Sequence, residues 1–317
     1  MWRIGAGFLV LVTLQYAMSQ GRLLPEEQIS SRLLKTNRTV RIYLPPSYEK
    51  QPRRRYPVLY LHDGQNVFSS AGANACFGWG NWGLDKTVDA LCASNQMRDI
   101  IMVAVDNSRF RYQEYRGPSA APGKGSAGRT DKASRKGDRT RFDDYAAFLA
   151  KELKPKIDRE YRTLKGSSST AVMGSSLGGI CSLALAWEDP KTFGGAASLS
   201  GSFQIGKGYF LQSVLRTYRG KAKPARIYLD SGTIDFTGDD DGRKNTDAVA
   251  AELRRIGWKE GKNLKHFVEE RTLTEGELER IGLRRDKWHE AQNSQHNEFY
   301  WRLRAWRALT FLFPPIR

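Results

Sequence analysis

Residues 171–187, AVMGSSLGGICSLALAW, decide the fold prediction because they combine a reactive-serine pattern with a strand before it and a helix after it. A Gly-x-Ser-x-Gly frame fits this stretch in one way, with Ser176 at the centre between Gly174 and Gly178. Ser176 is then the candidate nucleophile, and Ser175 fills the turn. The short pattern alone is weak evidence, so its surroundings have to carry the interpretation.

Those surroundings have the form that the chemistry needs. Residues 169–174 are predicted to form a short buried strand, and the apolar residues after Ser176 a helix. A sharp strand-to-helix turn raises the serine hydroxyl above the sheet edge, and the helix N-terminus favours a developing negative charge. The alternative is a serine that merely caps the helix in a tight turn.

The rest of the chain alternates apolar, β-rich runs with helical patterns, which predicts an α/β fold with a mostly parallel central sheet flanked by helices. Its 317 residues, with 40% hydrophobic content, suffice for a large core. No repeat or linker marks a boundary, so residues 20–317 are expected to form a single domain. Strands are predicted at 39–48, 56–64, 99–107, 169–174, 194–201, 225–232 and 264–270, and the longest helices at 143–161, 177–187, 246–258 and 296–313.

The first 19 residues have the anatomy of a secretory signal peptide. Arg3 precedes an apolar run from Phe8 to Leu14, and small residues at Ala17 and Ser19 precede a cleavage site before Gln20. A membrane anchor is the alternative, but the apolar run is too short to span a bilayer comfortably. We therefore expect an exported protein, secreted or periplasmic, without stable membrane insertion after cleavage.

The formal net charge of +17 predicts a basic surface but no particular partner. The charge is spread along the chain and no nucleic-acid-binding motif is present, so a nucleic-acid partner is not expected. The densest basic tract, residues 117–141, is rich in Gly, Ser and Ala and is predicted to be a surface loop.

Three cysteines provide no disulfide framework. Cys76 and Cys92 could pair in an oxidising compartment. Cys181 lies on the apolar helix predicted after the serine and is expected to be buried in the protein core. No Cys/His set has metal-ligand spacing, so neither a metal nor another cofactor is expected.

A serine hydroxyl becomes nucleophilic only when a base takes its proton, and an acid has to orient that base. In α/β-hydrolases the chain order is serine, acid, histidine. His62 precedes the serine, His266 lies within a strand pattern, and His289 lies on a helical stretch predicted to face solvent. His296, in a polar turn before the last helix, is therefore the predicted base, with a polar residue at a helix N-terminus as the alternative.

The acid is expected on the loop after the strand at 225–232. Asp235 is the first carboxylate on the loop proper and is the predicted acid, with Asp240 in reserve. Asp230 belongs to the strand end, and the run Asp239–Asp241 is interpreted as a solvated turn that caps a helix.

Two backbone N–H groups are expected to form the oxyanion hole. One belongs to Leu177, the residue after the nucleophile, and the other to Gln65 in the loop LHDGQNVF, where Gly64 permits a turn. A plain β-turn is the alternative for this loop.

The chain resembles a known family, the esterase D-like "putative esterases" of the α/β-hydrolase class. This family includes enterochelin esterases and feruloyl and acetyl-xylan esterases. The resemblance covers roughly residues 35 to 313. It rests on motifs that occur in order, namely YLPPSY, YPVLYLHDGQNVF, NSRFRYQEYRGP, LKPKIDREYRT, AVMGSSLGG, YLDSGTID and HNEFYWRLRAWRALTFLF.

The resemblance implies an α/β-hydrolase fold and a serine hydrolase with Ser176, Asp235 and His296 as triad and Gln65 and Leu177 as oxyanion donors. Two segments depart from it. The basic stretch 117–141 looks longer than usual, and residues 271–295 look added, with Thr274 and Glu277 predicting a capped helix. An added segment beside the base could form a lid or narrow the acyl pocket.

Together these features predict an exported carboxylic ester hydrolase that acts through an acyl-enzyme, with small-molecule or carbohydrate esters, siderophore esters among them, as candidate substrates. Trp79, Trp82 and Trp301 are candidates for stacking on a sugar or aryl ring, although most tryptophans only pack. Acyl transfer to a sugar hydroxyl and a non-catalytic binding protein on the same fold are the alternatives. The sequence does not indicate an oligomeric state.

Overall fold

A computed structural model describes residues 20–118 and 140–316. The predicted signal peptide, residues 1–19, and residues 119–139 of the basic stretch lie outside the described residues. Within the described ranges no helix is both long and apolar enough to cross a membrane.

One sheet runs through the described part of the chain, with strand order β1-β3-β5-β4-β6-β7-β8-β9 and β2 paired with β3. The strands from β5 to β9 in this order are parallel, whereas β3 is antiparallel to β1, β2 and β5. Their bounds are β1 (Arg22–Leu23), β2 (Glu27–Ser31), β3 (Thr36–Leu44), β4 (Val58–His62), β5 (Ile101–Val105), β6 (Thr170–Ser175), β7 (Gly195–Leu199), β8 (Arg226–Ser231) and β9 (Leu264–Val268).

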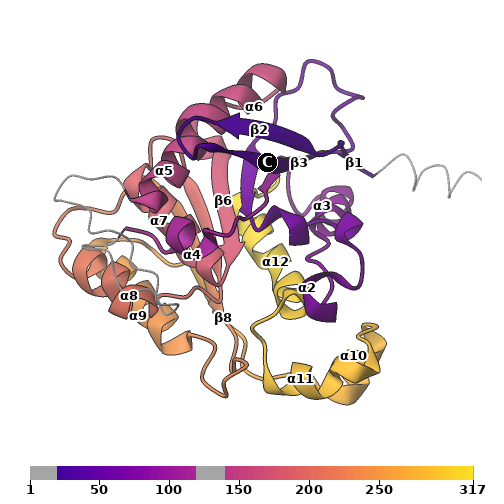
Figure 1. The fold of residues 1–317 in the computed structure, drawn as a ribbon, viewed down its shortest axis with the longest axis vertical. Helices are drawn as coiled ribbons and strands as arrows, with labels where there is room; N and C mark the ends of the chain where they lie inside the picture. Colours follow the sequence, from indigo (N-terminus) through magenta and orange to yellow (C-terminus); the bar gives the residue numbers. More distant parts are fainter. Residues whose placement is uncertain (1–19, 119–139, 317) are drawn as a thin grey trace, which may run out of the picture.

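Helices cover both faces of this sheet (Figure 1). The α-helices are α2 (Ala75–Gly78), α3 (Leu84–Ala93), α4 (Arg111–Tyr115), α5 (Arg141–Ala147), α6 (Lys154–Glu160), α7 (Leu177–Glu188), α8 (Ile205–Tyr209), α9 (Arg243–Ile256), α10 (Glu275–Arg280), α11 (Trp288–Asn293) and α12 (Glu298–Leu312). Short or widened turns are η1 (Gly64–Asn66), η2 (Ser69–Ala71), η3 (Phe148–Leu153), η4 (Ser167–Ser169), η5 (Phe210–Leu215) and η6 (Arg285–Lys287).

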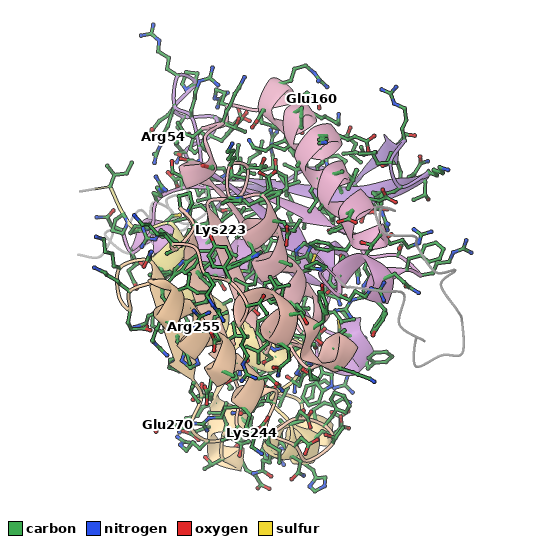
Figure 2. All side chains as sticks on the ribbon, turned by 90° about the vertical axis from the view of Figure 1, so that its left-hand side faces the viewer. Arg54, Glu160, Lys223, Lys244, Arg255 and Glu270 are labelled. Carbon is green, nitrogen blue, oxygen red and sulfur yellow. The ribbon has the colours of Figure 1, made fainter. Side chains whose placement is uncertain are left out.

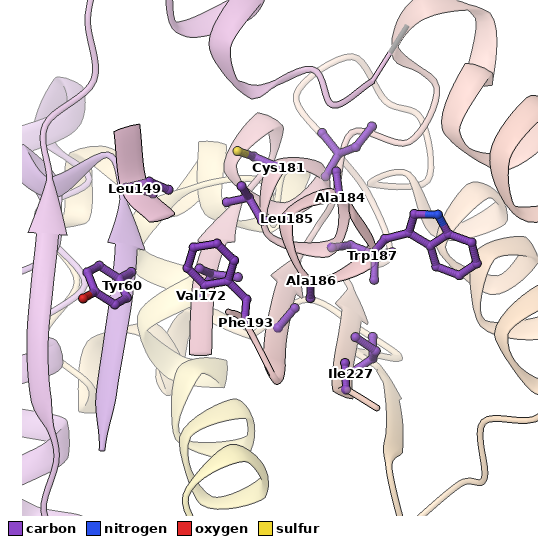
Figure 3. Close-up of a cluster of buried hydrophobic side chains, with 14 of the residues drawn as sticks. Tyr60, Leu149, Val172, Cys181, Ala184, Leu185, Ala186, Trp187, Phe193 and Ile227 are labelled. Atoms are coloured by element: carbon purple, nitrogen blue, oxygen red, sulfur yellow. The ribbon is translucent and has the colours of Figure 1, made fainter. Parts of the chain in front are cut away.

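The core lies on both sides of the sheet because successive side chains of a strand point to opposite faces. In β4, Val58 and Tyr60 pack into the cluster beneath α7, whereas Leu59 and Leu61 pack into the cluster beneath α12. Figure 3 shows the first cluster, with Cys181 buried in it as predicted. Strands that are buried on both faces explain why the sequence shows continuous apolar runs.

The predicted α/β-hydrolase fold, with a mostly parallel sheet flanked by helices, is confirmed. The edge strands β1 and β2 were not predicted, since residues 22–31 alternate polar and apolar side chains only weakly. The helix predicted at 143–161 begins earlier, because Thr140 and Asp143 form a capping box, and it widens at η3. Helix α9 begins at Arg243 after Gly242, three residues before the start predicted at Thr246.

Charged side chains of both signs are spread over the molecule. Figure 2 shows Arg54 and Glu160 near the top of one face and Lys244 and Glu270 near its bottom. The view agrees with the even distribution of basic residues along the sequence.

Candidate active site

Ser176 joins β6 to α7 in a backbone conformation that non-glycine residues rarely adopt, with φ 54° and ψ −122°. It occupies the N-cap position of α7, yet its side chain makes no capping hydrogen bond. Its Oγ lies 3.2 Å from Ser202 Oγ. A simple helix-capping serine, the alternative from sequence, therefore does not describe this side chain, and the strained turn is typical of a functional site.

The surrounding glycines are required by close packing. A Cβ on Gly174 would lie 2.8 Å from the backbone of Gly178, and one on Gly179 would lie 2.6 Å from Ser198 Oγ. A Cβ on Gly178 would approach the Cβ of His62 to 3.2 Å. The GSSLGG sequence thus lets the turn press against β4 and β7.

His296, just before α12, is held by a buried carboxylate. Its Nδ1 lies 2.6 Å from Oδ1 of Asp241, and the Asp241 side chain is fully buried. The second oxygen of Asp241 accepts hydrogen bonds from Ser200 Oγ at 2.7 Å and from the Gly232 N–H at 2.6 Å. This arrangement fixes the orientation of the imidazole, as an orienting acid has to do.

Asp235, the acid predicted from sequence, does not make this contact. Its carboxylate accepts hydrogen bonds from the N–H and hydroxyl of Thr237 at 2.8 and 2.6 Å and from the N–H of Asp239 at 3.1 Å. It therefore closes its own turn. The reserve candidate, Asp240, lies at the start of α9, where Lys244 is its partner.

The run of three aspartates hides the carboxylate that contacts His296, because its members face different ways. Asp239 is exposed, whereas Asp241 has a left-handed backbone, with φ 51°, and is 1% exposed. Gly242, which follows with φ 68°, helps to turn the chain inward before α9. The signal in the sequence was the glycine directly after the run, but a charge run usually indicates a solvated surface.

The loop after β4 places Gln65 at the same end of the sheet. Gln65 lies in η1, and its side-chain oxygen accepts a hydrogen bond from the Asn107 N–H at 3.1 Å. The left-handed turn residue is Asp63, with φ 55°, not Gly64. Gly64 is needed because a Cβ there would lie 2.8 Å from backbone atoms of β5.

A charge pair locks this strained loop. Arg111 donates from Nε and Nη2 to the two oxygens of Asp63 at 2.6 and 2.8 Å, and Asn107 donates to the same carboxylate at 2.6 Å. Such bidentate pairs fix geometry as well as contributing energy. Leu177, the other predicted donor residue, is the first residue of α7, where a backbone N–H has no partner within the helix.

A cavity of about 770 Å³ joins these groups. Ser176, His296 and Gln65 all line it, so three of the predicted site residues meet in one place. Its walls are largely aromatic and amide side chains, namely Asn66, Phe77, Trp79, Trp82, Asn107, Phe236, Asn293, Asn297 and Trp301. Phe77 and Phe236 are 95% and 75% exposed, and they contribute apolar surface to the lining.

Residues 271–295 form one wall of the cavity. His289, Glu290 and Asn293 of α11 line it, and the capping box predicted between Thr274 and Glu277 is present at α10. Figure 1 shows α10 and α11 at the lower end of the molecule, below α2 and α12. The prediction that His289 faces solvent holds only in part, because it is exposed and yet reaches the cavity.

Most charges of the cavity are neutralised. The lining cation of the described residues, Arg111, is paired with Asp63, and Glu290 is paired with Lys287 at 3.0 Å. Glu298 has the thiol of Cys76 as its side-chain partner, and burial raises the pKa of its carboxyl. Arg111 also acts electrostatically on Glu298, but its ion pair is with Asp63, and Glu298 forms no ion pair with a described lining residue.

The remaining cysteine and histidine residues have structural partners. Cys76 and Cys92 are free thiols, and Cys92 is hydrogen-bonded to Asp99, so the disulfide considered from sequence is not formed. His62 is buried against Tyr145, whose hydroxyl lies 3.0 Å from its Nδ1, and burial lowers its pKa to about 4. Within the described ranges no cluster of His, Cys, Asp or Glu is placed to hold a metal ion.

Comparisons with solved structures agree with the fold. A ferulic acid esterase superposes with a TM-score of 0.63 at 16% identity, with 94% of this chain and 99% of that chain covered. The enterobactin esterase of Shigella flexneri superposes with a TM-score of 0.62 at 18% identity, and 94% of this chain spans 61% of that one. The uncharacterised protein YbbA of Bacillus subtilis (strain 168) is 22% identical over 252 residues, 76% of this chain and 82% of YbbA.

The fold and the cavity thus define an α/β-hydrolase. The family model described as "Putative esterase" matches residues 30–309, so the chain belongs to this family. Family membership places the chain among the carboxylic ester hydrolases, as the resemblance implied.

Proposed function

We propose that the protein hydrolyses carboxylic esters through an acyl-enzyme formed on Ser176, with His296 as base and Asp241 as the orienting acid. The observation that carries this proposal is the 2.6 Å contact between His296 and the buried Asp241 beside a cavity that Ser176 also lines. The strained turn at Ser176 supports it.

The reaction follows from these positions. His296 takes the proton of Ser176 as Oγ attacks the ester carbonyl, and the N–H groups of Leu177 and Gln65 hold the oxyanion. The imidazolium, stabilised by Asp241, then protonates the leaving alcohol. A water molecule that gives its proton to His296 attacks the acyl group, and the carboxylic acid leaves as Ser176 regains its proton.

The cavity favours a neutral or cationic ester with an aromatic or sugar-like ring. Trp79, Trp82 and Phe77 offer flat apolar faces, and asparagine side chains offer hydrogen bonds to hydroxyl groups. The carboxylate of Glu298, which forms no ion pair of its own, disfavours an anionic substrate when it is ionised. A small-molecule or carbohydrate ester therefore fits the walls better than a highly charged siderophore.

We also propose export, on the evidence of the first 19 residues alone. The mature chain should begin at Gln20. N-terminal sequencing of the protein from the culture fluid or periplasm tests this, and an intact Met1 in material from the cytoplasm would contradict it.

A fluorophosphonate probe tests the catalytic proposal. Such probes bond covalently to activated serines, and peptide mass spectrometry locates the adduct. We expect the adduct on Ser176, and denatured protein should not be labelled. An adduct on another residue, or equal labelling after denaturation, would overturn the proposal.

A further inference from the structure

Behind Asp241 lies a second, fully buried pair of charges. Arg304 of α12 is 1% exposed, and its Nη2 lies 3.2 Å from Oδ1 of Asp230 at the end of β8. The same nitrogen lies 4.0 Å from Oδ2 of Asp241. A guanidinium and two carboxylates therefore share one buried site directly behind the imidazole.

Ser200 connects these groups. Its Oγ donates to Asp241 at 2.7 Å and accepts from Arg304 Nη2 at 2.7 Å and from Trp301 Nε1 at 3.1 Å. Its backbone, with φ 47°, is in the left-handed region. Hydrogen bonds run continuously from Arg304 through Ser200 and Asp241 to His296. The buried pair of Arg304 and Asp230 therefore helps to hold His296 in position.

Because these charged groups are buried, their electrostatic interactions are stronger than they would be in water. Burial raises the pKa of Asp230 even though Arg304 opposes the shift, so this carboxylate depends on Arg304 to remain ionised. Ionisable groups elsewhere face the same site. Tyr228 donates a hydrogen bond to Asp230 at 3.1 Å, and Glu269, just after β9, interacts electrostatically with Arg304. Asp235 and the cavity residue Glu298 interact electrostatically with His296.

We infer that Asp230 and Arg304 are positioning residues that act through Asp241 to set the pH at which His296 loses its proton. The inference rests on the proposed function. Arg304 holds Asp241 in place against His296 through Ser200, and Asp230 balances the positive charge so that the imidazolium can still form during catalysis. Neither Asp230 nor Arg304 touches the substrate in this scheme.

The pH profile of kcat/KM tests this, since its acid limb reports the ionisation of the base in the free enzyme. Asp230→Asn leaves Arg304 uncompensated, which disfavours the imidazolium, so we expect the acid limb to move down by roughly one pH unit. The double variant Asp230→Asn/Arg304→Met removes both charges and should return the limb to within a few tenths of a unit of wild type.

Tyr228→Phe is the matched control, because it removes a neutral hydrogen bond to Asp230 and no charge. The acid limb of its kcat/KM profile should lie at the same pH as in wild type. A purely structural role predicts lower activity at every pH in all of these variants with the limb unmoved. An unmoved or raised limb in folded Asp230→Asn, or a double variant that keeps the shift, would overturn the inference.

If Asp230→Asn does not fold, Arg304→Gln takes its place. Loss of the positive charge leaves Asp230 and Asp241 uncompensated and favours the imidazolium, so an acid limb above that of wild type supports the inference and an unmoved or lower limb overturns it. Failure of the proposed function itself would show differently, as hydrolysis that persists without Ser176.

Discussion

His296 contacts Asp241 at 2.6 Å and not Asp235, although Asp235 comes first on the loop after β8. We expect Asp241→Asn to lower kcat by about 10⁴-fold, because the amide leaves the imidazole in the wrong tautomer. Asp235→Asn is the matched control, since it removes a carboxylate from the same loop, and it should keep kcat within about threefold of wild type. Steady-state hydrolysis of p-nitrophenyl acetate measures both, and the opposite ranking would restore Asp235 as the acid.

Glu298 should select substrates by charge. We expect kcat/KM to be higher for an ester whose acyl ring carries an ammonium group than for the neutral parent, and about tenfold lower for one that carries a carboxylate. In Glu298→Gln, the kcat/KM values for the three esters should become similar. Glu290→Gln serves as control because Lys287 already neutralises that carboxylate. An order that survives Glu298→Gln would show that other groups set the preference.

Stability should fall with decreasing pH because buried His62 takes up a proton less readily than it does in the unfolded chain. Burial lowers its pKa to about 4 in the folded state from the ordinary 6.5. The unfolded chain then binds the proton more readily, so the stabilisation is complete above pH 6.5 and is lost as pH falls toward 4. Between pH 7 and pH 4.5 the loss should be about 2–3 kcal/mol.

Urea unfolding at the two pH values measures this loss. A His62→Gln variant should show a smaller decrease, whereas His266, whose pKa is also lowered by burial, contributes in both proteins. An equal decrease in the variant would mean that His62 is not the group responsible.

Gly179 and Gly276 should respond oppositely to replacement by alanine. A Cβ on Gly179 would lie 2.6 Å from Ser198 Oγ and 3.0 Å from the Cα of Gly201, so overpacking should cost about 1–3 kcal/mol of unfolding free energy. A Cβ on Gly276 in α10 meets no atom within 4 Å, and helix propensity should raise stability by roughly 0.5–1 kcal/mol. Chemical denaturation checks both, and a neutral Gly179→Ala would contradict the tight turn.

The sequence predicted the groups whose signal is local. Ser176 lies in a recognisable strand–turn–helix pattern, and His296 follows from chain order with few histidines to choose from. The central parallel strands are buried on both faces, so their apolar runs are continuous and easy to recognise. The edge strands β1 and β2 lack that signal.

The carboxylate that contacts His296 and the charges behind it could not be predicted in this way. Asp241 is distinguished from Asp239 and Asp240 by burial, which depends on its contacts with Ser200 after β7 and Gly232 after β8. Arg304 lies 63 positions after Asp241 in an apolar helix, and their proximity exists only in the folded chain. Local patterns do not encode such contacts.

The most direct test of the account is the rate of ester hydrolysis by Ser176→Ala beside that by Ser175→Ala, with folding checked by circular dichroism. The serines are adjacent, so general damage to the turn should affect both variants. We predict that Ser176→Ala loses at least about 10³-fold in kcat, whereas Ser175→Ala remains an active esterase. A folded Ser176→Ala protein with undiminished hydrolysis would contradict the central claim.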